Sequence, residues 1–240
     1  MTLNARDVAQ LIDISAVQAP HGAAEIRTLV DNARRYHFIA VHVLPCWVTY
    51  LKGLLAGSPG ILVGAPVGFP AGAHRTEIKS AEAKLLVQDG VQEMDMMLNV
   101  GKLRSGELEY CEEDIRAVVR VAAPVPVKVI LEVHHLDREQ LKRACEICIR
   151  AGAAYVKTAT GWAPSGATLE VVQFLTSFVG SAIKVKAAGN IRSIDTVLTM
   201  YRMGVARFGI NLNAAVQIVQ AVAAMPGGFV DAALEDEVGR

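Results

Sequence analysis

The sequence lacks the features that mark membrane, secreted and nucleic-acid-binding proteins. No uninterrupted apolar run approaches the roughly 18 residues of a membrane span, and the N-terminal MTLNARDVAQ carries charges where a signal peptide needs an apolar core. Lysine plus arginine equals aspartate plus glutamate at 24 each, and no basic run occurs, which argues against a nucleic-acid or membrane-surface partner. We therefore expect a cytoplasmic enzyme that acts on a small molecule.

Cysteine is also scarce. The four cysteines lie in segments with a helical pattern, at Cys46, Cys111, Cys145 and Cys148. Cys145 and Cys148 form a CxxC, a spacing that also occurs in redox and metal sites. Here they lie within LKRACEICIRAG, where positions i and i+3 share one helix face with other apolar side chains. We interpret both as buried small hydrophobic residues.

Apolar runs, in contrast, are abundant. Hydrophobic residues make up 52% of the 240 residues, enough for one large core. Strand-like runs alternate with helical patterns along the whole chain, at residues 11–16, 38–44, 61–67, 91–98, 127–133, 154–159, 182–188 and 205–209. Each interval suits one strand, one helix and two loops. The pattern predicts an α/β protein with a single (β/α)8 barrel domain over residues 1–240, and a doubly wound sheet is the alternative.

Glycine marks the ends of the clearest helices. Segments 76–90 and 136–152 have helical spacing and end on Gly90 and Gly152, which are typical helix C-caps. From residue 224 to residue 240 the sequence becomes acidic and less periodic. We expect this tail either to fray or to fold over the barrel.

Two short runs each deliver a lysine and then break at glycine. They are YVKTATG, at 155–161, and IKVKAAGNIR, at 183–192. A parallel strand presents a side chain at the mouth of a barrel in this way, so Lys157 and Lys186 would face one pocket. Burial and like charge both favour a neutral amine, which attacks carbonyls to form a Schiff base. The alternative is that each lysine extends its stem along apolar surface to place its charge at a rim.

Asp95 lies in the middle of a predicted strand, where a carboxylate needs a buried partner. It is either a structural ion-pair partner of inward-facing lysines or a general acid/base beside the amine, and the two roles are compatible. The other strand ends predicted for the mouth of the barrel carry Asp13, His42, Phe69 with Pro70, Asn99, Glu132 with His134 and His135, Thr158 with Thr160, and Gly209 with Asn211.

The histidines are candidates for a metal site. His42, His134 and His135 could join Glu132, since three nitrogen or oxygen ligands suffice for catalytic zinc. However, His134 and His135 are adjacent and would point to opposite faces of a strand, and the sequence has no HExxH or HxH spacing. We therefore expect no metal, and histidines that contact the substrate or are satisfied in the core.

With Lys157, Lys186 and Asp95 assembled, the chain resembles the deoxyribose-phosphate aldolase family from about residue 11 to residue 220. The segments that carry the resemblance are GFPAGAHRTEIKSAEA, EMDMMLNVGKLRSGE, VKVILEV, YVKTATG and VKAAGNIR. It implies a class I aldolase that reversibly cleaves 2-deoxy-D-ribose 5-phosphate to acetaldehyde and D-glyceraldehyde 3-phosphate, with no cofactor. It also implies that Lys157 forms the Schiff base, Lys186 depresses its pKa, and Asp95 relays protons through water.

The resemblance further implies a substrate pocket. Its residues would be Asp13, Ser15, His42, Thr158, Thr160, Gly161, Gly189, Asn190, Arg192, Gly209 and Asn211. Some depart from the family pattern: Asn190 stands where a second glycine is usual, and Asn211 with Leu212 replaces a pair of small residues. Trp162 follows Gly161 where members carry Phe or Lys, Ser15 takes the position of a threonine, and His42 that of a cysteine. These departures indicate that the shape of the substrate or its dependence on phosphate differs from that of the family, while Lys157, Lys186 and Asp95 are retained.

Other readings remain open. One is a sibling Schiff-base aldolase for a different, non-phosphorylated sugar or hydroxy-aldehyde. A metal-dependent lyase built on His42 and His134 and a non-catalytic sugar-binding barrel are the others. The resemblance also implies a homo-oligomer, most simply a dimer formed through outer helices.

Overall fold

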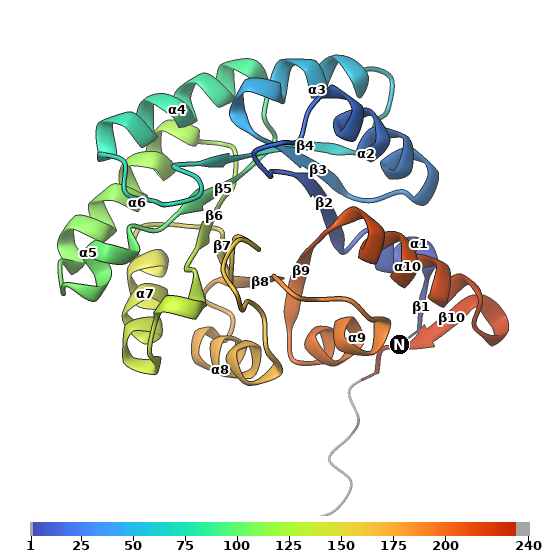
Figure 1. Ribbon diagram of the computed structural model, residues 1–240. Helices are drawn as coiled ribbons and strands as arrows, with labels where there is room; N and C mark the ends of the chain where they lie inside the picture. The colour runs from blue at the N-terminus through green and yellow to red at the C-terminus, as the bar shows by residue number, and fades with distance from the viewer. Residues whose placement is uncertain (1, 234–240) are drawn as a thin grey trace, which may run out of the picture.

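The computed structural model describes residues 2–233, and within them eight parallel strands close into a barrel (Figure 1). The strands are β2 (Ile12–Ala16), β3 (Ala40–Val43), β4 (Leu62–Val67), β5 (Glu93–Met97), β6 (Val127–Ile130), β7 (Tyr155–Lys157), β8 (Lys184–Ala188) and β9 (Val205–Ile210). Each pairs with its neighbour in chain order, and β9 closes onto β2. The predicted (β/α)8 barrel and its strand positions are confirmed, and the doubly wound alternative is wrong.

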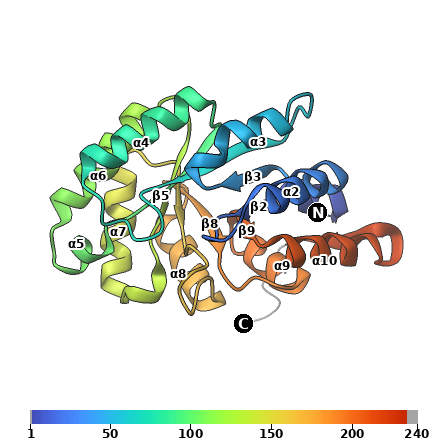
Figure 2. The ribbon, with the colours of Figure 1, turned by 45° about the horizontal axis from the view of Figure 1, so that its top comes forward.

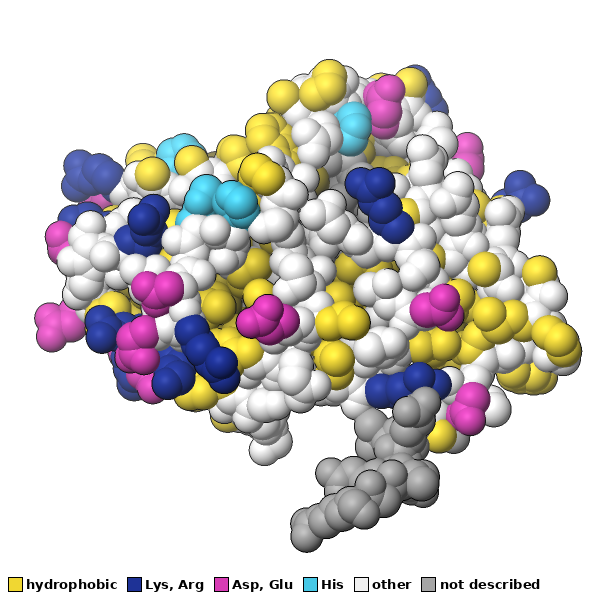
Figure 3. Space-filling view, turned by 60° about the horizontal axis from the view of Figure 1, so that its bottom comes forward, with side chains coloured by type: hydrophobic (Ala, Val, Ile, Leu, Met, Phe, Trp, Pro, Cys, Tyr) yellow, Lys and Arg dark blue, Asp and Glu magenta, His cyan; other side chains and the backbone are white. Residues whose placement is uncertain are grey.

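Helices surround the barrel (Figure 2). The longer ones are α2 (Ala23–Tyr36), α4 (Thr76–Asp89), α6 (Leu108–Ala122), α7 (Arg138–Arg150), α8 (Leu169–Val179), α9 (Ile194–Arg202) and α10 (Leu212–Ala223). Shorter elements are α1 (Ala5–Ala9), α3 (Val48–Leu54) and α5 (Val100–Arg104), with 3-10 turns η1 (Pro45–Trp47), η2 (Val133–His135) and η3 (Pro226–Gly228). None of these described helices is long and apolar enough to cross a membrane. Basic and acidic side chains lie interspersed on the face shown in Figure 3.

The predicted helix ends agree with the backbone. Gly90 caps α4 in the left-handed region, with φ 94°, and Gly152 follows α7 with φ 80°. Glycine adopts this conformation without the steric cost that a Cβ would add. Cys145 and Cys148 are fully buried on the inner face of α7, as predicted, and burial raises the pKa of the Cys145 thiol to about 12. They therefore pack as small apolar residues.

Part of the predicted tail is regular structure. Residues Phe229–Asp231 form β10, which pairs antiparallel with β1 (Thr2–Asn4), close to α1 and α10 (Figure 1). Val230 is buried opposite Leu3, while Phe229 and Asp231 are exposed. Side chains therefore alternate between buried and exposed along β10, and the buried one packs against Leu3. These residues are therefore not frayed, since Val230 and Ala232 belong to the buried core. Residues 234–240 lie outside the described part of the chain.

The strand register determines which side chains meet inside the barrel. Lys157 on β7 lies opposite Lys186 on β8, and Asp95 on β5 lies opposite Lys128 on β6. Side chains that are opposite in register share one face of a sheet, and here that face is the interior. The fold therefore gathers charged groups from separate strands into one interior cluster.

Candidate active site

Lys157, Lys186 and Asp95 meet inside the barrel. The Nζ atoms of Lys157 and Lys186 each donate a hydrogen bond to Asp95 Oδ2, both at 2.7 Å. The side chain of Lys186 is 1% exposed and that of Lys157 is 12% exposed, so Lys157 is the more accessible amine. The structure thus brings together the three side chains predicted to be catalytic.

The surroundings separate the two lysines electrostatically. Burial lowers the pKa of Lys157; the Asp95 carboxylate opposes this effect, and the Lys186 ammonium adds to it. Burial also acts on Lys186, but there the carboxylates of Asp13 and Asp95 outweigh it and hold its pKa above the ordinary value. Lys186 Nζ lies 2.6 Å from Asp13 Oδ2, and Gly209 leaves room for this contact. Lys157 is therefore the amine that more readily loses its proton.

Asp95 remains ionised in this setting. Burial acts to raise its pKa, but Lys157 and Lys186 outweigh burial and hold the pKa well below its usual range. Its second oxygen, Oδ1, is buried and has no hydrogen-bond partner among the described residues. The Lys128 ammonium lies near that oxygen, with its Nζ 3.6 Å away.

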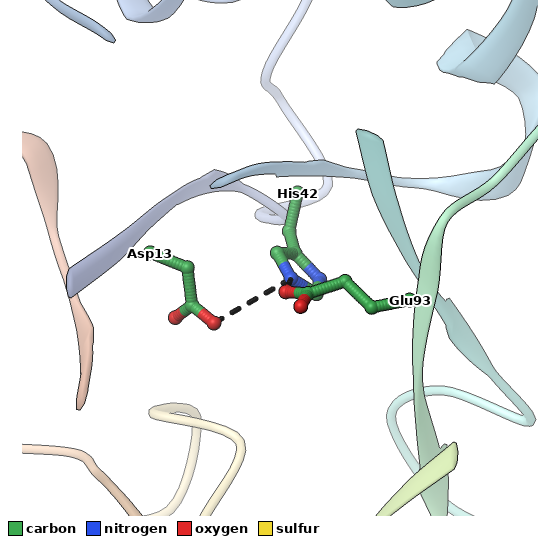
Figure 4. Close-up of side chains that lie close together, drawn as sticks. All are labelled: Asp13, His42 and Glu93. Atoms are coloured by element: carbon green, nitrogen blue, oxygen red, sulfur yellow. Dashed lines mark hydrogen bonds and ion pairs between the residues drawn. The ribbon is translucent and has the colours of Figure 1, made fainter. Parts of the chain in front are cut away.

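A deeper set of ionisable groups was missed by the sequence reasoning. Glu93 Oε1 lies 2.7 Å from His42 Nε2, and Glu93 Oε2 lies 3.0 Å from Lys128 Nζ and 3.6 Å from an Arg207 guanidinium nitrogen. Figure 4 shows Asp13 and Glu93 converging on the His42 ring. The signal was present in EMDMM, because Glu93 and Asp95 are two residues apart and so face the same side of a strand.

A cavity of about 240 Å³ opens above this cluster. Its lining includes Lys157, Lys186 and Asp95 together with most of the predicted substrate contacts, namely Asp13, Ser15, His42, Thr160, Gly161, Gly189, Asn190, Arg192, Gly209 and Asn211. Thr158 is an exception. It is fully buried, and its hydroxyl donates to the carbonyl of Ala188 at 2.7 Å and accepts the Ala188 N–H at 2.8 Å, so it ties β7 to β8. Gln18 and His21 line the cavity and were not predicted.

The loops after β8 and β9 form one end of this cavity. Gly189 and Asn190 both adopt left-handed backbone conformations, with φ 91° and 65°. Asn211 caps α10, since its side-chain oxygen accepts the Ala214 N–H at 3.0 Å. A helix N-terminus favours an anion, and the Arg192 side chain lines the same cavity. This end of the cavity can hold a phosphate group.

The histidine metal site is not assembled as considered from the sequence. His134 and His135 lie in the 3-10 turn η2 and not on a strand, both are exposed, and His134 Nδ1 lies 2.7 Å from Ser165 Oγ. Glu132 bonds instead to the hydroxyl and the N–H of Thr160.

Within residues 2–233, the potential ligands that do come within 4.8 Å of one another are Asp13, His42 and Glu93. Each of the two carboxylates already has a lysine beside it: Lys186 lies 2.6 Å from Asp13, and Lys128 lies 3.0 Å from Glu93. A cation entering this cluster would have to displace those ammonium groups.

Comparison with known proteins gives a consistent result. No model of a protein family matches the chain. The deoxyribose-phosphate aldolase of Rhizobium meliloti is 50% identical over 232 residues, which cover 97% of this chain and 94% of that protein. Among solved structures, QR15, an aldolase, is 34% identical with a TM-score of 0.84 over 90% of this chain and 95% of its own. The tetrameric deoxyribose phosphate aldolase of Aeropyrum pernix is 27% identical, with a TM-score of 0.84 over 92% of each chain.

Proposed function

This chain belongs to the deoxyribose-phosphate aldolase family, and we propose that Lys157, Lys186 and Asp95 carry out its reaction. The protein is a carbon–carbon lyase, a class I aldolase that reversibly cleaves 2-deoxy-D-ribose 5-phosphate to acetaldehyde and D-glyceraldehyde 3-phosphate. One observation supports the residue assignment above all: two lysines share one Asp95 oxygen, and their pKa values are displaced in opposite directions.

The chemistry follows from that difference. Neutral Lys157 attacks the C1 aldehyde of the open-chain sugar and loses water to give an iminium, which serves as the electron sink. Asp95, directly or through a water molecule, takes the proton of the C3 hydroxyl as the C2–C3 bond breaks. Lys186 stays charged and balances the carboxylates of Asp13 and Asp95. These steps need no cofactor, because the iminium formed on Lys157 is itself the electron sink.

The residues that line the cavity support one orientation of the substrate. The phosphate would lie against Arg192 and the loop at Gly189 and Asn190, near the start of α10. The sugar hydroxyls would contact Ser15 on β2 and His42 on β3. The guanidinium of Arg192 favours a phosphorylated substrate over a neutral sugar of the same length.

We also propose that residues 1–240 act as one barrel domain that forms a homodimer in the cytoplasm. One core cluster runs from Leu3 to Ala232, which supports a single domain. The four cysteines are free thiols, as is usual in a reducing compartment. The Aeropyrum pernix relative is a tetramer, so light scattering on the purified protein is the test of the dimer.

Borohydride trapping tests the function directly. The protein would be incubated with deoxyribose 5-phosphate, and separately with unphosphorylated deoxyribose, then reduced and analysed by peptide mass spectrometry. We expect a reduced adduct on Lys157, formed far more readily from the phosphate ester. Equal adduct from both sugars would keep the mechanism but indicate a non-phosphorylated substrate. An adduct on another residue, or none, would contradict the assignment of Lys157.

A further inference from the structure

His42 is held by its surroundings in one orientation. Its ring projects from β3 into the barrel, where Nε2 lies 2.7 Å from Glu93 Oε1 and 3.6 Å from Asp13 Oδ2 (Figure 4). On the side of β4 the ring lies directly against Gly64, where a Cβ would come within 2.4 Å of the ring atoms Cε1 and Nε2. Because the side chain is also buried, these contacts fix the position of the imidazole.

The same contacts determine which ring nitrogen carries a proton. An ionised carboxylate only accepts hydrogen bonds, so Nε2 donates to Glu93 and is protonated in both charge states of the ring. In the neutral imidazole, Nδ1 is then the bare, basic nitrogen. Nδ1 lies 3.8 Å from Asp95 Oδ2, the oxygen to which both lysines donate. A basic nitrogen therefore faces the catalytic carboxylate.

Asp95 alone is poorly suited to hold a proton. Lys157 and Lys186 outweigh burial and keep its pKa well below the usual range of a carboxyl group. A neutral imidazole carries a basic nitrogen that can take up a proton and release it again. His42 lines the same cavity as Asp95 and Lys157, so it is in position for this task.

We propose that His42 is a further catalytic residue, which holds the proton that Asp95 takes from the substrate. The proposal rests on the Schiff-base function proposed above. As the C2–C3 bond breaks, its electron pair forms the C1=C2 bond of the enamine on Lys157, and the O–H pair forms the C3 carbonyl. The hydroxyl proton passes by way of Asp95 to Nδ1 of His42. A proton then returns by the same route to C2 of the enamine, so both side chains end the cycle unchanged.

The charges around the ring suit a group that becomes cationic during the cycle. The charged groups near His42 are Asp13 on β2 and Glu93 and Asp95 on β5. The cations Lys128, Lys157, Lys186 and Arg207 lie behind these carboxylates. The carboxylates face the ring, whereas these cations are bound to the carboxylates. An imidazolium at this position would therefore be stabilised by the carboxylates around it.

Two half-reactions of acetaldehyde separate this role from a structural one. Iminium formation is measured by borohydride trapping on Lys157. Enamine formation is measured by the uptake of deuterium from D2O into the methyl group of acetaldehyde. His42→Gln keeps an N–H donor for Glu93 but has no basic nitrogen. We expect trapping within about threefold of wild type, and deuterium uptake and sugar cleavage reduced on the order of 100-fold or more.

Two further variants test the role of the imidazole independently of His42→Gln. Gly64→Ala retains the imidazole but displaces the ring, and we expect the same selective loss of deuterium uptake. In His42→Ala, added imidazole should restore uptake, and substituted imidazoles should restore it more effectively as their basicity rises. Deuterium uptake within threefold of wild type in His42→Gln would overturn the proposal, as would equal losses of trapping and uptake. Failure of the wild type to form an adduct would instead contradict the Schiff-base function itself.

Discussion

Lys157 and Lys186 lie opposite each other in the register of β7 and β8 and donate to the same oxygen of Asp95, each at 2.7 Å. They nevertheless have different electrostatic roles, because only Lys186 also contacts Asp13, at 2.6 Å. That second carboxylate holds the charge on Lys186, while burial and the neighbouring ammonium destabilise the charge on Lys157. Reactivity is therefore assigned to one of two chemically identical side chains by one additional carboxylate.

Lys157→Ala should abolish turnover and leave the fold intact, since the neighbouring amine of Lys186 is held in its charged form and cannot attack the aldehyde. Steady-state cleavage and circular dichroism check the two halves of this prediction. The matched control is Lys184→Ala, which removes an exposed lysine from the same barrel sheet and should leave activity unchanged. A Lys157→Ala rate above about a hundredth of wild type would eliminate the Schiff-base assignment.

Lys186→Met should move the acidic limb of the pH profile of kcat/KM to higher pH. Activity requires neutral Lys157, so it rises as the pH passes through the pKa of this lysine. In the wild type that pKa lies below the ordinary value, and removing the like charge of Lys186 raises it. The measurement is the pH dependence of kcat/KM and of the trapping rate. A limb that stays in place or moves to lower pH would contradict the assigned role of Lys186.

Much of the barrel could be predicted because each strand is an apolar run bounded by glycine, proline or polar residues. Asp95 could be found as well, since a carboxylate inside such a run needs a buried partner. Lys128 and Arg207 could not, because a single cation in a short strand looks like a rim residue until the register of neighbouring strands is known. Contacts between strands far apart in sequence leave no local signal.

Thr158 was misassigned for a different reason. Side chains alternate along a strand, so if Lys157 faces the interior, the next residue faces the other way. Strict use of that period would have excluded Thr158 from the substrate contacts; its hydroxyl instead joins β7 to Ala188. The short strand β10 was missed because its alternation covers only Phe229–Asp231, and its partner β1 lies at the other end of the chain.

Asn190→Gly combined with Leu212→Ser should lower KM for deoxyribose 5-phosphate and leave KM for unphosphorylated deoxyribose unchanged. Asn190 has φ 65°, a conformation that glycine adopts without strain. Removing the asparagine side chain makes the backbone N–H groups of this loop more accessible to the phosphate. A serine at the first position of α10 adds a hydroxyl donor at a helix N-terminus. Initial-rate kinetics with both sugars give the result. An unchanged KM for the phosphate ester would show that these departures do not weaken phosphate binding.

Lys79→Met should destabilise the fold by about 3–5 kcal/mol, because it leaves a buried carboxylate unpaired. Lys79 and Asp114 are both fully buried between α4 and α6, with Nζ 2.6 Å from Asp114 Oδ2 and 3.0 Å from the carbonyl of Met97 at the end of β5. Urea unfolding measures the loss.

The double variant Lys79→Met with Asp114→Leu removes both charges and should recover most of that stability. As the exposed counterpart, Lys102→Met breaks the pair with Glu107, at 3.0 Å, and should cost at most about 1 kcal/mol. If the double variant were as unstable as Lys79→Met, the loss would come from packing around the lysine stem and the Met97 carbonyl, and the unpaired charge would not be its cause.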